Sequence, residues 1–220
     1  KNLTQEIEEM LLLHEVGHAL YTTEDGYGIV YTEKKHLKGY ANIIEDVRIE
    51  KKMKDRYPGS RKSFNMGYTE LNERDFFSVK GKDLSKLLLI DRINIFYKVG
   101  YASSVQFTPE EYVYVQRTDQ CKTEADVIDL AEEIFNFSKS EKQKEQEEEK
   151  LTRAENGGGN FSDVNPDDTS EVDEDELTPE TVDAFDESLS RIQDHDSHTE
   201  YYEPDFESHA EKVIVDYKHI

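Results

Sequence analysis

The chain has 220 residues, with 50 acidic and 27 basic side chains that give a formal net charge of −23. This charge excludes non-specific binding to nucleic acid, because such binding needs a basic patch that neutralises phosphates. The single cysteine, Cys121, excludes an internal disulfide framework and is typical of a reducing compartment. No apolar run approaches the roughly 18 residues of a membrane span, and nothing resembles a signal peptide. We therefore expect a cytoplasmic protein of a bacterium or of a phage-infected host.

The first helix is predicted over residues 2–23 and carries the sequence His14-Glu15-Val16-Gly17-His18. Residues four apart lie on one face of a helix, so His14 and His18 can present two imidazoles to one metal ion. Glu15 can reach a water bound to that ion. This is the HExxH arrangement of zinc metallopeptidases, in which the glutamate takes a proton from the attacking water. The motif predicts a Zn²⁺ site with Glu15 as the general base.

The segment after this helix contains a cluster of turn residues over 24–28. Residues 29–32 (Ile-Val-Tyr-Thr) are predicted to form a short strand. His36 follows in a basic loop and is interpreted as a surface histidine.

A second helix, predicted over residues 39–57, offers a third metal ligand. A catalytic zinc commonly takes two histidines and one carboxylate, with water in the fourth position. At about 100° per residue, Asp46 shares a face with Asn42 and Glu50, whereas Glu45 falls on the more polar side. This favours Asp46 as the ligand, with Asn42 and Glu50 orienting it or the histidines. Many zincins use a glutamate in this place, which favours Glu45, so both carboxylates remain candidates.

The motif together with the run Asn42-Ile43-Ile44-Glu45-Asp46-Val47-Arg48-Ile49-Glu50 resembles metallopeptidase domains joined to von Willebrand factor A domains in bacteria and tailed phages. It is also similar to a cobaltochelatase subunit. The resemblance covers about residues 1–138 and is specific across residues 10–56. It implies a zincin-like core, a zinc site, and an AAA+ ATPase and a von Willebrand factor A domain as partners. The Asp-x-Ser-x-Ser motif of a von Willebrand metal site does not occur in the sequence. Because zincins place a substrate-binding sheet before this helix, we expect the chain to be part of a longer protein.

Further helices are expected over residues 66–79 and 84–99, after Thr108-Pro109, and from Thr123 through a polar extension to Lys150. Hydroxyl groups that can stabilise an oxyanion are available on Tyr40, Tyr97 and Tyr101, although packing is the simpler role for each.

Composition divides the chain into three parts. Residues 1–138 are expected to form a zincin-like helical metal-binding domain, residues 139–208 an acidic and largely disordered linker, and residues 209–220 the start of a following domain. Within the linker, a short amphipathic helix is predicted over residues 178–192, and it could dock on a partner. A strand is expected over residues 212–217. The expected fold class is mainly α.

These features predict a zinc-dependent metallopeptidase that hydrolyses peptide bonds, with His14, His18 and either Asp46 or Glu45 as ligands. The alternative is a non-catalytic, metal-bound interaction module that partners an AAA+ ATPase in a chelatase or remodelling complex. A substrate groove next to Glu15 would favour the enzyme.

Overall fold

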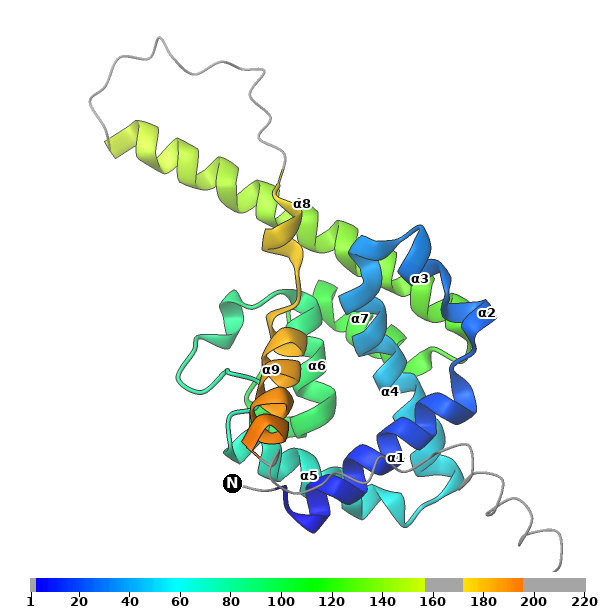
Figure 1. The fold of residues 1–220 in the computed structure, drawn as a ribbon. Coiled ribbons are helices and arrows are strands. Elements are labelled where there is room, and N and C mark those ends of the chain that lie inside the picture. Colours follow the sequence, from blue (N-terminus) through cyan, green and yellow to red (C-terminus); the bar gives the residue numbers. More distant parts are fainter. Residues whose placement is uncertain (1–2, 157–171, 196–220) are drawn as a thin grey trace, which may run out of the picture.

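The computed structural model describes residues 3–156 and 172–195, and helices are the only regular elements in these two ranges (Figure 1). The longer helices are α1 (Gln5–Tyr21), α4 (Lys38–Arg56), α5 (Ser60–Glu73), α6 (Leu89–Val99), α7 (Pro109–Gln120), α8 (Glu124–Asn156) and α9 (Glu180–His195). The shorter ones are α2 (Glu24–Tyr27), α3 (Ile29–Thr32) and the 3-10 turns Lys35–Leu37, Leu84–Lys86, Gly100–Ser103 and Glu174–Leu177. The prediction of a mainly helical protein is confirmed. No helix of the described ranges combines the length and apolarity needed to cross a bilayer.

Three predicted elements differ from the structure. Residues 29–32 form helix α3 rather than a strand, because the amide of Glu33 donates locally to the carbonyl of Ile29 and no neighbouring strand is present among the described residues. The helix expected over 66–79 lies at 60–73, and the chain turns at Asp75, which has a φ of 60°. The helix expected over 84–99 begins at Leu89, after a separate 3-10 turn.

Two apolar clusters hold the helices together, and α4 and α6 contribute to both. One cluster joins α4, α6 and α8, through residues such as Ile44, Ile90 and Ile134. The other joins α1, α5 and α6, through residues such as Met10 and Phe64. Helix α4 therefore lies between α1 and α8, which places its polar residues next to the histidine motif.

Gly17 sets the close approach of α1 to α4. A side-chain carbon at this position would lie 3.2 Å from Ile49 and 3.2 Å from Met53, which is tighter than ordinary van der Waals contact. The glycine thus brings the turn that carries the two histidines onto the face of α4.

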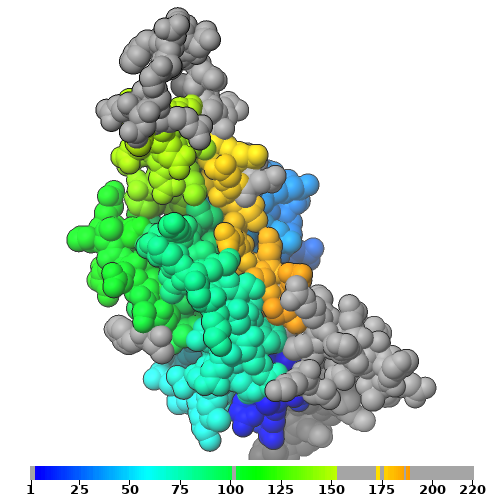
Figure 2. Space-filling model, turned by 90° about the vertical axis from the view of Figure 1, so that its left-hand side faces the viewer, coloured from blue at the N-terminus to red at the C-terminus, as the bar shows by residue number. Residues whose placement is uncertain are grey.

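Part of the acidic region packs on the core. Val172, Leu177 and Thr181 are buried, and α9 contacts α6 and lies beside it in Figure 1. Figure 2 shows the orange residues of α9 packed against the blue-green part of the chain. The linker over 139–208 is expected to be largely disordered apart from a short helix, and the described residues 172–195 include that helix and a preceding segment held on the core by a few apolar and hydroxyl groups. The predicted short helix is confirmed as α9, and it packs on this chain's own core. The expected boundary at residue 138 falls inside α8, and the residues expected to start a following domain lie outside the described part.

Replacing Leu177 with Ala should lower the free energy of unfolding by about 2 to 5 kcal/mol, the usual cost of such a truncation in a packed core. Leu177 is 1% exposed and belongs to the cluster formed by α4, α6 and α8. The matched control is Leu151→Ala, at a residue 65% exposed near the end of α8. Urea unfolding checks the prediction. Equal stability of the two variants would show that the segment 172–177 does not contribute to the core.

Candidate metal centre

Two helices bring three potential ligands together. His14 and His18 lie one turn apart on α1, and Asp46 lies on α4. Nε2 of His14 is 3.6 Å from Oδ1 of Asp46, and Nε2 of His18 is 3.3 Å from the same oxygen. One ligand atom from each of the three residues lies within 4.8 Å of the others. Among the described residues, this is the only such group of three.

The donor set and its spacing fit zinc. Two imidazole nitrogens and one carboxylate oxygen are the ligands of many catalytic zinc sites. Ligand atoms bound at about 2.0 to 2.1 Å in a tetrahedral arrangement lie roughly 3.3 Å apart. Both distances to Oδ1 of Asp46 are close to this value. Because Oδ2 accepts a hydrogen bond from Lys98 at 2.9 Å, Asp46 offers one oxygen to a metal.

Each imidazole is oriented through its other nitrogen. Nδ1 of His14 lies 3.2 Å from Oε1 of Glu50, which also accepts a hydrogen bond from the hydroxyl of Tyr68. Nδ1 of His18 lies 3.1 Å from the hydroxyl of Thr22. With each Nδ1 engaged in this way, both Nε2 atoms face Asp46. Contacts of this kind fix the tautomer and ring orientation of metal-binding histidines.

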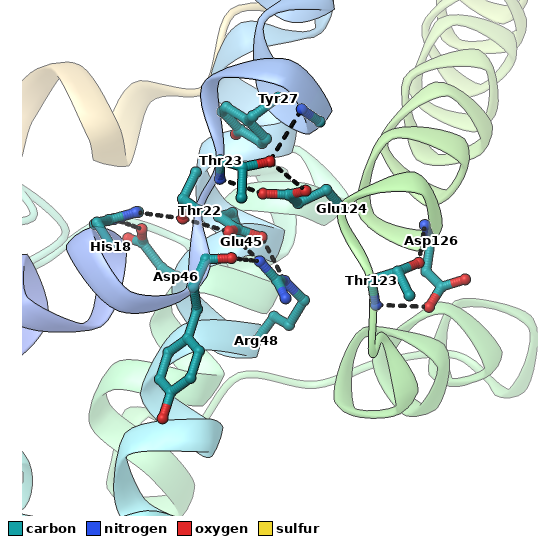
Figure 3. Close-up of polar contacts among 12 residues, drawn as sticks. His18, Thr22, Thr23, Tyr27, Glu45, Asp46, Arg48, Thr123, Glu124 and Asp126 are labelled. Atoms are coloured by element: carbon teal, nitrogen blue, oxygen red, sulfur yellow. Dashed lines mark hydrogen bonds and ion pairs between the residues drawn. The ribbon is translucent and has the colours of Figure 1, made fainter.

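Glu45 is not brought into this group. Its carboxylate is fully buried and accepts two hydrogen bonds from the guanidinium of Arg48, at 2.7 and 2.5 Å. It also accepts a hydrogen bond from Thr22, so it supports His18 through the threonine hydroxyl (Figure 3). The expectation that Glu45 lies on a polar, solvated side of the helix is wrong, because α4 is buried on most of its circumference. Of the two candidate carboxylates, the structure places only Asp46 beside both histidines.

The charges of the site favour ionised carboxylates. Burial by itself raises the pKa of Asp46, but Lys98 and His14 outweigh burial and hold that pKa well below its ordinary value. Burial likewise opposes ionisation of Glu50, but the hydrogen bond from His14 and the charge of Lys54 lower its pKa to about 2. Both carboxylates are therefore ionised beside the histidines at neutral pH, and each is also paired with a lysine, Asp46 with Lys98 and Glu50 with Lys54.

The site opens into a cleft of about 530 Å³, which is also lined by Glu15. Glu15 is exposed, whereas His14 and Asp46 are largely buried in the wall. Residues of α9 line the cleft as well. Glu15 of the motif thus borders the same cleft as the three grouped residues.

Other residues singled out in the sequence lie elsewhere. Tyr40 is buried in the core, the hydroxyl of Tyr97 donates to the carbonyl of Val115, and His36 packs against Phe135. The side chain of Tyr101 lies outside the described part. Asn42 accepts a hydrogen bond from Tyr27 and makes no hydrogen bond to the three ligands.

Sequence reasoning missed Thr22, Tyr68 and Lys98. Thr22 lies four residues after His18, a spacing that signals contact on a helix. Tyr68 and Lys98 come from α5 and α6, and no local pattern links them to the motif.

No protein-family model matches this chain, and neither a curated protein nor a solved structure matches it. The resemblance to the metallopeptidase domains joined to von Willebrand factor A domains remains a prediction from the motif and the α4 run.

Asp91 on α6 fixes the position of α9 at the cleft. The buried carboxylate accepts hydrogen bonds from the backbone amide and the hydroxyl of Thr181, at 2.9 and 2.6 Å, and from the amide of Glu180 at 3.3 Å. Burial raises the pKa of Asp91 to about 6, although these hydrogen bonds lower it in part. The protonated form is thus favoured more in the folded protein than in the unfolded chain.

A pH dependence follows from this shift. The contribution of Asp91 to stability is fully present below about pH 4 and is lost as the pH rises through about 6. The stability of the wild type relative to Asp91→Asn should therefore fall by about 2 to 3 kcal/mol between pH 4 and pH 7. Urea unfolding of both proteins at several pH values measures the difference. A difference that does not change with pH would contradict the raised pKa.

Proposed function

We propose that this chain is a zinc-dependent metallopeptidase in which His14, His18 and Asp46 hold the metal and Glu15 is the general base. The observation that carries the proposal is the convergence of three ligand atoms within 4.8 Å at the wall of a cleft that Glu15 also lines. Structural zinc sites generally have four protein ligands and are closed, whereas catalytic sites have three and an open position. Three ligands beside an accessible cleft support the catalytic alternative.

The residues of the site would have different roles in the reaction. When bound, zinc supplies a Lewis acid that lowers the pKa of a water molecule toward 7. Glu15 accepts a proton from the water that attacks the peptide carbonyl, and then delivers it to the leaving amine nitrogen. Glu50 and the pair Thr22 and Glu45 hold the two imidazoles in orientation. The compartment we propose is the cytoplasm, supported by the single free cysteine.

A second function is supported by two observations. The amine of Lys98 already neutralises one oxygen of Asp46, and the described residues contain no strand against which an extended substrate could align. Both favour a non-catalytic, metal-bound module, and the resemblance implies an AAA+ ATPase and a von Willebrand factor A domain as its partners. Zinc would then stabilise the crossing of α1 and α4, and Glu15 would have no chemical role.

A peptide-library digest tests the proposal. The zinc-loaded protein is incubated with the library and the products are identified by mass spectrometry, with the metal-free protein and His18→Ala as controls. We expect cleavage that depends on zinc and is lost in His18→Ala. A zinc-loaded wild type that cleaves no peptide would favour the interaction module.

A further inference from the structure

One end of the cleft is apolar and is built from three separate segments. Leu11 comes from α1, Phe77 from the loop after α5, and Val182 and Phe185 from α9. We name these four residues the apolar subsite. Leu11 precedes His14 by three residues, which corresponds to about 4.5 Å along a helix axis. The subsite therefore begins within one helical turn of the candidate metal centre.

The opposite end of the cleft is polar. Thr22, Tyr27 and Asn42 line it, and they are linked to the metal centre or to one another by hydrogen bonds. The cleft runs along α1 from Leu11 at its apolar end to Thr22 at its polar end, with both histidines between them. A peptide lying along this direction would place chemically different parts on the two sides of the metal.

Helix α9 holds its part of the subsite firmly. The ring of Phe185 stacks on Phe77 with centroids 5.8 Å apart, and the amine of Lys98 lies 5.6 Å from the centre of the same ring. At the start of the helix, the hydroxyl of Thr181 donates to Asp91 and accepts from the side-chain amide of Asn94, at 2.6 and 2.9 Å. These buried bonds explain why a helix from an acidic region can form a fixed wall of the cleft.

We infer that the apolar subsite binds an apolar side chain of the peptide substrate and that Phe185 determines this preference. The inference rests on the proposed function, because it takes the ligand of the cleft to be a peptide. Leu11, Val182 and Phe185 are partly buried and still line open space, whereas Phe77 is buried and supports the ring of Phe185 from behind, so a Leu or Phe side chain would remove more apolar surface of the first three from water. The net charge of −23 favours peptides that carry Lys or Arg at other positions. The substrate class is therefore a basic peptide with an apolar anchor.

The test uses fluorescein-labelled nonapeptides with basic flanks and a central Ala, Leu, Phe, Glu or Lys. Their binding to the zinc-loaded Glu15→Gln protein, which should not cleave them, is followed by fluorescence anisotropy. Central Leu or Phe should bind about 10- to 100-fold more tightly than central Glu, as expected for burial of one such side chain. Phe185→Lys should reverse this preference toward Glu, and Phe185→Leu should retain it. Val113→Ala, at an exposed apolar residue on α7, is the matched control and should behave as the parent protein.

Equal affinities for the five peptides, no binding of any peptide, or an unchanged preference in folded Phe185→Lys would each overturn the inference. Should Phe185→Lys fail to fold, Val182→Lys places the same charge in the subsite and must show the same reversal. The wild type is then tested for cleavage of the peptide that binds best. Binding without cleavage would contradict the proposed function but not the subsite. Cleavage without a central preference would contradict the subsite but not the proposed function.

Discussion

Replacing Glu15 with Gln should lower peptide hydrolysis by about 10²- to 10⁴-fold, the usual contribution of a general base. The amide has nearly the size of the carboxylate and the same position at the cleft, but it cannot accept a proton from water at neutral pH. Glu15 is exposed and is not one of the three grouped ligands, so zinc content and thermal stability should stay close to those of the wild type.

The measurement combines kcat/KM for a peptide from the library digest with metal analysis of the same sample. Glu8→Gln is the matched control, because Glu8 is also an exposed glutamate of α1 but does not line the cleft. We expect the control to keep full activity. Equal hydrolysis by the wild type and Glu15→Gln would show that Glu15 is not the base.

Asp46→Ala should weaken zinc binding much more than Glu45→Ala. Loss of Asp46 removes a ligand oxygen, whereas Glu45 acts on His18 through Thr22, and loss of such an indirect contact typically weakens metal binding by about 10- to 100-fold. Glu45→Ala also leaves the guanidinium of Arg48 buried without its carboxylate, which should lower the free energy of unfolding by about 3 kcal/mol or more. Stability does not separate the two variants, because Asp46 is itself paired with Lys98. Zinc affinity does.

Zinc affinities are measured by competition with a chelator, at a temperature where circular dichroism shows each variant to be folded. Asp46→Asn serves as a second variant that keeps the size of the side chain. Glu45→Gln likewise keeps the size of Glu45 and limits the disturbance around Arg48. The reverse order of affinities would transfer the ligand role to Glu45.

The parts of the site that follow helix geometry could be predicted from the sequence. His14 and His18 share a face of α1 because they are four residues apart, and Asp46 shares a face of α4 with Glu50 for the same reason. The structure places Glu50 against His14 as expected. The same argument predicts that Asn42 orients the ligands, but Asn42 pairs with Tyr27, whose position depends on the short helix α2.

Contacts between distant segments could not be predicted. Glu45 and Arg48 look like a solvated pair three residues apart, but the backbone carbonyls of Tyr21 and Lys122 accept from the guanidinium and complete its burial. Thr181 is held by Asp91, 90 residues earlier in the chain. The overall composition of the acidic region does not reveal that one hydroxyl, that of Thr181, donates a hydrogen bond to the buried carboxylate of Asp91.

The central claim is that His14, His18 and Asp46 form one zinc site, and zinc titration of the metal-free chain tests it most directly. Isothermal titration calorimetry of the wild type should give about one zinc per chain, with proton release because bound histidines must be neutral. His18→Ala, folded by circular dichroism, should show no binding of comparable affinity. A wild type that binds no zinc, or a His18→Ala variant that binds one zinc with unchanged affinity, would contradict the site.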